Sequence, residues 1–590
     1  DGGITKTVFT RDTKHLDSKK ALFGDSDDLE IYHDGSNSFI KENGQGNLYL
    51  RASDNLYIQR TSDGADIAQF SGGGGVELYH NAVKKFETTS TGITVTGAVN
   101  GIPFFSDAGG GSMYTHNVSA TQSTAELNTA YGFTALDAIT TGDNNTVMGY
   151  GAGGAVTTGA ENTLIGSLAG DALTTGNYNI AVGRSALSTS LDGDHNTAIG
   201  VYALEDYEDG DGNGFNTAVG SQSQAQATTG EFNTSLGASS MGVGVTTGDF
   251  NSAIGYKALL NVTSGEKNTA LGGFSLANVS TGSYNVSLGY NALGSANGSE
   301  SANVAIGFES LSSLDAGGSN YNTAVGYNTG TAMTTAIENT LIGGFAGDAI
   351  TTGSSNTALG YHSLGAENTG SRAVAIGYGT LHNQDYNGSS YNVAVGYDAG
   401  AAVTTGVQNT IIGGLAGDAL TSGLSNTALG MRALSTDTTG RYSVAIGQGA
   451  LENQNFTGSN NVYNTAVGFD AGNDITSGVQ NTLIGGLAGD ALTTGVSNIA
   501  LGYAALSSAQ TSNYNTAIGE SALHLNINSN RNTALGFQAL YSHTTGSATD
   551  SYNTAIGYVA GASITSGTEN TLVGGLAGDA ITTGHSSTAL

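Results

Sequence analysis

The feature that most constrains the fold of this chain is a 15-residue sequence motif that occurs several times. Asn481–Gly495 reads NTLIGGLAGDALTTG, and near-copies begin at Asn162, Asn339, Asn409 and Asn570. A shorter unit of the form Asn-Thr-Ala-Ile-Gly recurs at 27 places from Asn128 onward, mostly 17 residues apart and otherwise 18 to 21. A period this short is too small for a helix pair and predicts a solenoid of short strands and turns.

Each repeat unit has the composition of a strand bounded by turns. Thr, Val, Ile and Leu occupy the expected strand positions, where branched side chains suit a pleated surface. Gly and Asn occupy the ends, where a positive φ is tolerated. Stacked coils would also place Asn over Asn in an amide ladder. We therefore predict an all-β fold, a parallel β-solenoid or β-roll of about 17-residue coils.

The coils recur in cycles of four. Asn322 and Asn392 are 70 residues apart, Asn392 and Asn464 are 72 apart, and Asn464 and Asn553 are 89 apart, which is one coil more. A catalytic site is normally built once, so repetition on this scale favours an architectural role.

Alternation along the strand assigns residues to two faces. In the unit that begins at Asn322, Thr323 and Val325 share one face, and Ala324 and Gly326 share the other. Neither face is charged. We interpret the strip of Ala and Gly as a surface that meets another copy of the chain closely, and we expect a symmetric rod.

The repeats resemble a known family. SVAIGQGAL at Ser443 and NVAIGFESL at Asn303 resemble the head repeats of trimeric autotransporter adhesins, which form a left-handed parallel β-roll. The resemblance covers residues 128–590 and implies a homotrimer around one axis. This chain departs from the family in its longer coils, its large loops and the Thr that often replaces Ser-Val.

The first hundred residues resemble a different group. The segments Ala21–Ile58 and Val76–Val99 resemble repeat-bearing segments of tail fibres from marine tailed bacteriophages. Their alternating apolar runs are broken by Asp34-Gly35, Asn43-Gly44 and the run Gly72–Gly75, which predicts β-hairpins.

Three regions follow from these patterns. Residues 1–100 form a β-hairpin region, residues 101–127 form a Gly-rich joint around Pro103 and Gly109–Gly111, and residues 128–590 form a β-roll shaft of 27 coils. The shaft reaches Leu590 in the middle of a strand unit, so we expect the array to be truncated there.

Charge and composition exclude several function classes. The net charge is −31; residues 1–100 hold 10 of the 17 Lys and Arg and 14 of the 48 acids, for a net −4, which leaves −27 on the rest. A chain this acidic is not expected to bind nucleic acid or anionic membranes. Cysteine is absent, and no apolar run approaches the roughly 18 residues of a membrane span.

One loop has the spacing of a metal site. Asp209, Asp211 and Asn213, followed by Gly214, match the start of an EF-hand-like calcium loop. The twelfth position would be Gly220, so the bidentate Glu is missing. Calcium binding and a solvated acidic turn both remain open, and no other cofactor is indicated.

Two repeated features admit a chemical and a structural interpretation. The Asp of each AGDA recurs four or more coils apart, roughly 19 Å, so these residues cannot pair as hydrolytic carboxylates and are expected to cap turns. Aromatic residues follow the strand Gly and are expected to pack between coils rather than on sugars; they are Tyr256, Tyr290, Phe308, Tyr327, Tyr397, Phe469, Tyr503, Phe537 and Tyr558.

The inserted loops are the candidates for ligand contact, because they vary while the coils do not. Their aromatic residues, which we consider as glycan contacts, are Tyr207, Tyr386, Phe456 and Tyr541. The scattered His residues have no metal spacing, and no nucleophile elbow, P-loop or dinucleotide motif is present, so we do not expect an enzyme.

Together these patterns predict the shaft of a homotrimeric bacteriophage tail fibre, a virion protein that extends a receptor-binding tip. Its expected partners are further copies of itself, other phage tail proteins, and a host glycan or outer-membrane receptor reached through a region outside this chain. The alternatives are a trimeric autotransporter-type adhesin at a cell surface and a fibre-borne polysaccharide depolymerase.

Overall fold

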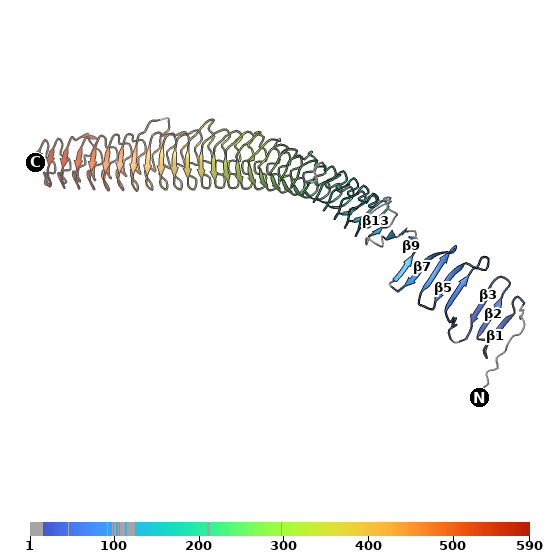
Figure 1. The fold of residues 1–590 in the computed structure, drawn as a ribbon. Coiled ribbons are helices and arrows are strands. Elements are labelled where there is room, and N and C mark those ends of the chain that lie inside the picture. The colour runs from blue at the N-terminus through green and yellow to red at the C-terminus, as the bar shows by residue number, and fades with distance from the viewer. Residues whose placement is uncertain are drawn as a thin grey trace. The chain divides into compact units, whose positions relative to one another are not determined.

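The computed structural model describes residues 16–44, 46–90, 92–96, 98–99, 102–103, 105–106, 112–114, 124–208, 213–296, 298–458 and 460–590. All regular secondary structure in these ranges is β-strand (Figure 1). The chain divides into two compact units, residues 1–104 and 105–590. Most of the joint predicted at 101–127 lies outside the described residues.

In its described residues, the first unit contains antiparallel sheets of three, five and two strands. Asp34 forms the turn between β2 and β3, where its Oδ1 accepts hydrogen bonds from the backbone N–H of Ser36 and Asn37 at 2.9 and 2.7 Å. The sheets have the orders β1-β2-β3, β4 to β8, and β10-β9. Their strands are β1 Lys20–Phe23, β2 Leu29–His33, β3 Ser38–Glu42, β4 Asn55–Gln59, β5 Asp66–Ser71, β6 Val76–His80, β7 Val83–Thr89, β8 Gly92–Val95, β9 Ala98–Val99 and β10 Ile102–Pro103.

The second unit is a parallel β-solenoid with one strand per coil in a single 29-stranded sheet. β11 and β12 pair antiparallel, and every later pair is parallel. From β13 on, each strand of this sheet begins one residue after the first residue of a repeat unit, which confirms the predicted period of about 17 residues. A further pair, β36 with β38, lies outside this sheet.

The strands of the second unit run as follows: β11 Phe105–Ser106, β12 Met113–Tyr114, β13 Thr129–Tyr131, β14 Thr146–Met148, β15 Thr163–Ile165, β16 Ile180–Val182, β17 Thr197–Ile199, β18 Thr217–Val219, β19 Thr234–Leu236, β20 Ser252–Ile254, β21 Thr269–Leu271, β22 Val286–Leu288, β23 Val304–Ile306, β24 Thr323–Val325, β25 Thr340–Ile342, β26 Thr357–Leu359, β27 Val374–Ile376, β28 Val393–Val395, β29 Thr410–Ile412, β30 Thr427–Leu429, β31 Val444–Ile446, β32 Thr465–Val467, β33 Thr482–Ile484, β34 Ile499–Leu501, β35 Thr516–Ile518, β36 Ser529–Asn530, β37 Thr533–Leu535, β38 Thr549–Asp550, β39 Thr554–Ile556, β40 Thr571–Val573 and β41 Thr588–Ala589.

A ladder of buried Asn side chains joins the coils. Asn128 Oδ1 accepts hydrogen bonds from the backbone N–H and from the side-chain Nδ2 of Asn145, at 2.8 and 3.0 Å. Asn145 Nδ2 also donates to the Gly159 carbonyl at 2.9 Å, which closes the turn of its own coil. The same bonds recur along the solenoid, so the predicted amide ladder is confirmed. Hydrogen bonds satisfied in this way offset the cost of burying an amide.

The strand-closing glycines are required by the close approach of the coils. Gly255 has a φ of 132°, and a Cβ placed on it would lie 2.7 Å from the carbonyl oxygen of Gly272 in the next coil. Left-handed backbone also recurs at ordinary residues: the residue before each ladder Asn has a positive φ, for example 60° at Tyr178. Each such residue costs about 1 kcal/mol, which the contacts between coils must offset.

Two interior positions of the coil share one space, so that a large side chain at one position accompanies a small residue at the other. The coil of Asn481 has Leu483 at the strand centre and Gly489 six residues later, whereas the coil of Asn498 has Ala500 and Leu506 at those positions. A Cβ on Gly489 would lie 2.9 Å from Leu483 Cδ2. Leu at one position therefore needs Gly at the other, because both side chains fill the same interior volume.

The four-coil cycle is a cycle of interior packing. In the coil of Asn464 both positions are small, Ala466 and Gly472. A Cβ on Gly472 would lie 2.7 Å from Leu483 Cδ1 in one neighbouring coil and 3.1 Å from Leu451 Cδ2 in the other. Two large neighbours thus fill the space above and below a small coil, which explains why NTLIGGLAGDALTTG recurs once per cycle.

We predict a strong coupling between Leu483 and Gly489. Leu483→Ala alone leaves a cavity and is expected to cost about 2–5 kcal/mol of unfolding free energy. Gly489→Leu alone overfills the same space and is also destabilising. The double variant reproduces the Ala and Leu pair of the next coil and should recover more than half of the summed loss, as measured by chemical denaturation. Losses that simply add would contradict the shared volume.

Candidate functional site

The central strand residues that the sequence assigned to self-association lie inside the coil. Ala324, at the centre of β24, has no exposed surface, and the central residue is likewise buried in the three-residue strands from β13 through β40. The prediction that this face meets another copy is therefore wrong for Ala324, whereas Gly326 after the strand is partly exposed. The interior of so short a coil is narrow, and a methyl group at the strand centre fits opposite the Leu of the following turn.

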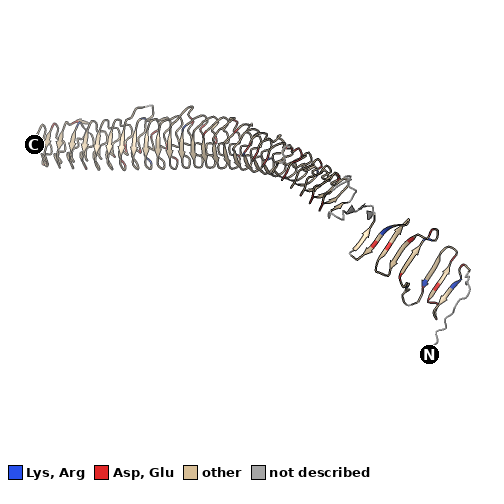
Figure 2. Cartoon of the chain, in the orientation of Figure 1, with Lys and Arg blue, Asp and Glu red and all other residues tan. Residues whose placement is uncertain are grey.

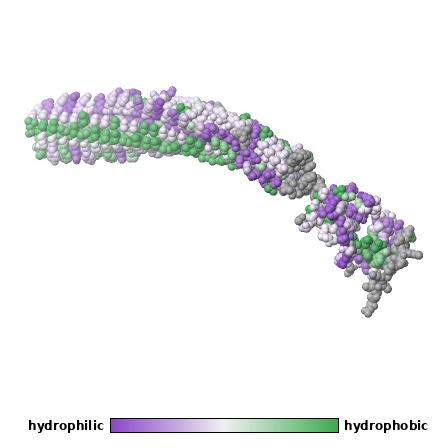
Figure 3. Space-filling view, in the orientation of Figure 1, coloured by the Kyte–Doolittle hydropathy of each residue, from purple (hydrophilic) through white to green (hydrophobic). Residues whose placement is uncertain are grey.

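The outward face of the sheet is uncharged. It is formed by the first strand residues, mostly Thr, and by the third strand residues, mostly Val, Ile and Leu; Thr465 and Val467 are examples, and both are partly exposed. None of the strands in the described 29-stranded sheet contains Lys, Arg, Asp or Glu (Figure 2). Figure 3 shows the result as a hydrophobic band that runs along the solenoid over the strands. We call this band the outward sheet face; it is the candidate interaction surface, because uncovered apolar surface on this scale marks a contact site.

A row of aromatic rings borders the face just beyond the strand glycines. The rings of nine successive coils lie 5.3 to 5.9 Å apart between centroids, so packing between coils is confirmed for this row. It consists of Tyr256, Phe274, Tyr290, Phe308, Tyr327, Phe345, Tyr361, Tyr378 and Tyr397. Phe537 and Tyr558 stack in the same way farther along the solenoid, at 5.4 Å.

A second row borders the face at the other end of the strands, and the sequence reasoning missed it. It occupies the left-handed residue before the ladder Asn, where Tyr178, His195, Phe215, Phe232 and Phe250 stack at 4.7 to 5.2 Å with rings within 2 to 6° of parallel. The sequence does contain the signal, as an aromatic residue immediately before the first Asn of successive repeat units. Since neighbouring rings of this second row cover one another, most of their faces are unavailable for stacking on a sugar.

The four loop aromatics considered as glycan contacts lie in different environments. Tyr207 has no exposed surface and Phe456 is 6% exposed, so neither ring can receive a ligand in this structure. An aromatic side chain in a loop buries more apolar surface by turning into the coil. Tyr386 and Tyr541 are partly exposed, and Tyr541 stacks on His524 at 5.1 Å.

The calcium hypothesis falls largely outside the described residues. Asp209 and Asp211 are not among them, and Asn213 is exposed and forms a backbone bridge with Asp194. Across the described ranges no group of three or more His, Cys, Asp or Glu side chains could hold a metal ion.

Four of the AGDA carboxylates are partly buried, and one oxygen of each accepts no hydrogen bond. Oδ1 is buried without a hydrogen-bond partner in Asp171, Asp348, Asp418 and Asp490. Burial raises the pKa of each of these four carboxyls. The fifth, Asp579, lies in the last full coil. Backbone hydrogen bonds act in the opposite direction and lower the pKa of each of the four carboxyls, so the expected capping of turns stays a prediction.

Polar side chains occupy the core where the ladder is interrupted. Ala373 and Ser443 replace the ladder Asn, so the Asn of the next coil needs another acceptor. Gln384 Oε1 accepts a hydrogen bond from Asn392 at 2.8 Å, and Gln454 Oε1 accepts one from Asn464 at 2.9 Å. The two sites are copies of one arrangement. A buried carboxylate holds each Gln through its Nε2, at 2.8 Å from Glu367 and 2.6 Å from Asp437.

His543 occupies the same core position in a third inserted coil. Its Nε2 lies 3.3 Å from Asn553 Nδ2, in the place that Gln454 Oε1 takes against Asn464. The side chain has no exposed surface. Burial lowers the pKa of His543 from 6.5 to about 4, because the charged ring would be desolvated.

No protein family, curated protein or solved structure matches this chain. Within the described residues no helix has the length and apolar character that crossing a bilayer requires.

We predict an acid-sensitive contribution from His543. The folded state disfavours its protonation, so its stabilising effect is present above pH 6.5 and is lost as the pH falls toward about 4. His543→Gln supplies an uncharged acceptor, as in the two equivalent coils. Thermal denaturation should show variant and parent alike at pH 7.5, with the variant more stable at pH 4.5 by up to roughly 2–3 kcal/mol. Equal stability at both pH values would contradict a buried neutral ring.

Proposed function

We propose that this chain is the structural shaft of a homotrimeric bacteriophage tail fibre, in which the outward sheet faces of three parallel copies pack around one axis. The observation that carries the proposal is the uncharged face that continues through every coil of the solenoid. The tail-fibre assignment also uses the resemblance of the N-terminal segments to phage tail-fibre repeats.

The regular spacing of the outward sheet face favours a second copy of the chain as its partner. Each coil adds one strand spacing, about 4.8 Å, along the solenoid. A partner that covers the whole face must present apolar groups at the same spacing over the same length. A second copy of the chain, parallel and in register, has that property by construction. The number three follows from the resemblance to trimeric adhesins, and the aromatic rows at both edges would then border contacts with two different neighbours.

The proposed role is mechanical. Twenty-seven coils span roughly 130 Å at the strand spacing, and the net charge of the chain, −31, keeps such rods apart in solution. A receptor-binding tip held by this shaft would lie far from the virion. In an adhesin the same shaft would stand on a cell surface, so the location of the protein on purified particles or on cells separates the two assignments.

The oligomeric state is the first test. Light scattering of the full chain should give three times 59.1 kDa. Val467→Glu, Ile484→Glu and Leu501→Glu together place carboxylates on the outward face of three successive strands, where like charges would be buried against one another. Hydrogen exchange in coils 464–515 should rise and the trimer should weaken.

The matched control places the same charges away from the face. Ser477→Glu, Thr494→Glu and Thr511→Glu change exposed turn residues of the same three coils and should leave both mass and exchange unchanged. A folded monomer formed by the parent chain would contradict the proposal outright.

Deleting coils tests the spacer role together with the packing cycle. Removal of residues 392–463 joins Leu381 to the small coil of Gly472, which Leu451 normally contacts. The fibre should image roughly 19 Å shorter and keep its melting temperature. Removal of residues 409–425 instead takes Ile411 from the space beside Gly400 and should lower the melting temperature, because a cavity remains. Equal effects of the two deletions would argue against phase-dependent packing.

A further inference from the structure

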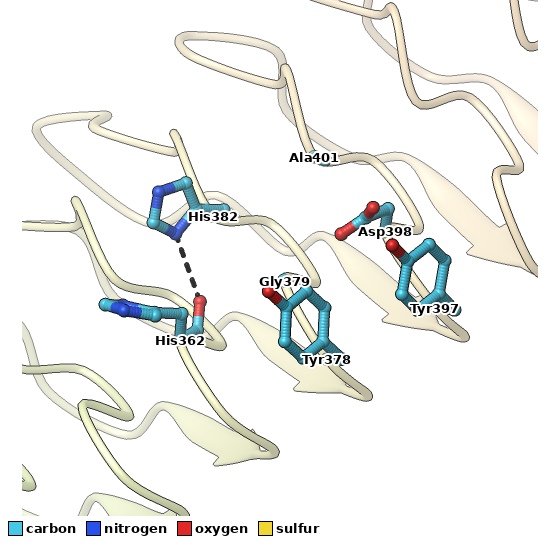
Figure 4. A pocket seen from close by; sticks show the side chains of 7 residues that line it. All are labelled: His362, Tyr378, Gly379, His382, Tyr397, Asp398 and Ala401. Carbon is cyan, nitrogen blue, oxygen red and sulfur yellow. Dashed lines mark hydrogen bonds between the residues drawn. The ribbon is translucent and has the colours of Figure 1, made fainter.

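A hollow of about 430 Å³ interrupts the regular surface beyond the ends of β26, β27 and β28. Figure 4 shows two tyrosines directly after the strands and two histidines in the turns that follow, with the Asp398 carboxylate beside Tyr397. We call this hollow the open notch; its lining is His362, Tyr378, Gly379, His382, Tyr397, Asp398 and Ala401. Its volume lies within the range of small-molecule sites, about 300–1,000 Å³.

The groups in the notch are arranged by backbone and by stacking. His382 Nδ1 lies 3.2 Å from the His362 carbonyl oxygen, which positions the imidazole against the previous coil. The Tyr378 and Tyr397 rings stack at 5.4 Å and 10°, so their edges, rather than their faces, border the hollow. Gly379 is the floor, and any side chain there would meet Asp398 Oδ1.

The same position one cycle later is filled by its own side chains. The residues 70 to 72 positions farther along include Arg432, Glu452 and Asn473 in place of His362, His382 and Ala401. Arg432 Nη1 lies 3.7 Å from Glu452 Oε1. Asn473 Nδ2 donates to the Gly449 carbonyl at 3.1 Å and to Glu452 Oε2 at 3.3 Å. This closed notch shows that the backbone does not require a hollow here; the residues of the open notch create it.

We propose that the open notch binds a neutral pyranose unit of a glycan. Imidazole nitrogens, phenol hydroxyls and a carboxylate all pair with hydroxyl groups, which a sugar ring presents around its whole edge. Asp398 and the net charge of −27 on residues 101–590 disfavour an anionic ligand. A metal ion is disfavoured because the described side chains offer no group of three suitable ligands. The site lies beyond the strand ends, where Tyr378 and Tyr397 belong to the aromatic row at the edge of the outward sheet face.

The test uses the full chain and three probes: methyl α-D-glucopyranoside, methyl β-D-galactopyranoside and N-acetyl-D-glucosamine, each measured by saturation-transfer difference NMR. At least one should receive saturation from the parent protein. The triple variant H362R/H382E/A401N introduces the three side chains that contact one another in the closed notch, and it should abolish that transfer. Its melting temperature should stay close to that of the parent, because Arg432, Glu452 and Asn473 occur together at the same positions one cycle later.

Two further variants separate this site from general adhesion of sugars. R432A alters the closed notch and should leave saturation transfer unchanged. The reverse exchange, R432H/Q448Y/E452H/F469Y/N473A, also supplies the two tyrosines in place of Gln448 and Phe469, and it should open the closed notch and increase the transfer. The proposal is overturned if none of the three probes receives saturation from the parent, or if the triple variant retains the parent's signal.

Discussion

The structure depends on hydrogen bonds that join each coil to the next. A coil of about 17 residues contains one strand of three residues, too little to form a core or a sheet alone. The ladder Asn links its own turn to the neighbouring backbone, as in Asn145, and does so in one direction along the axis. The spacing between ladder and strand is therefore fixed, and additional residues are accommodated only in the loops, as before Asn392 and Asn464.

The period, the strand positions and the amide ladder were all predictable from sequence, because each is a local property of residue type and spacing. The choice of inward face was not. Alternation separates Ala324 from Thr323 and Val325 but does not say which side faces the interior. The pattern that identifies the inward face is the pairing of a large residue with a small one, such as Leu483 with Gly489. Such a pairing is required when both residues lie in one narrow core.

Loop chemistry was harder to predict for a related reason. Tyr207 and Phe456 stand in variable loops, yet both are buried, because an insertion can fold an aromatic ring back onto the coil. The open notch was not visible as a motif, since its residues come from three coils and only the contrast with Arg432 and Glu452 one cycle later distinguishes it. The residues of interest in such an array are those that break its period, not those that obey it.

The direction of the ladder has a mechanical consequence. In a sheet whose strands lie across the axis, hydrogen bonds between coils run along it, so tension loads the junctions one after another in series. Rupture then occurs at the weakest junction and leaves the others intact. The coils that begin with Ala373 and Ser443 lack the ladder amide, and Gln384 and Gln454 reach across from the core in its place. We therefore expect the junctions that follow Ala373 and Ser443 to be among the first to rupture under tension.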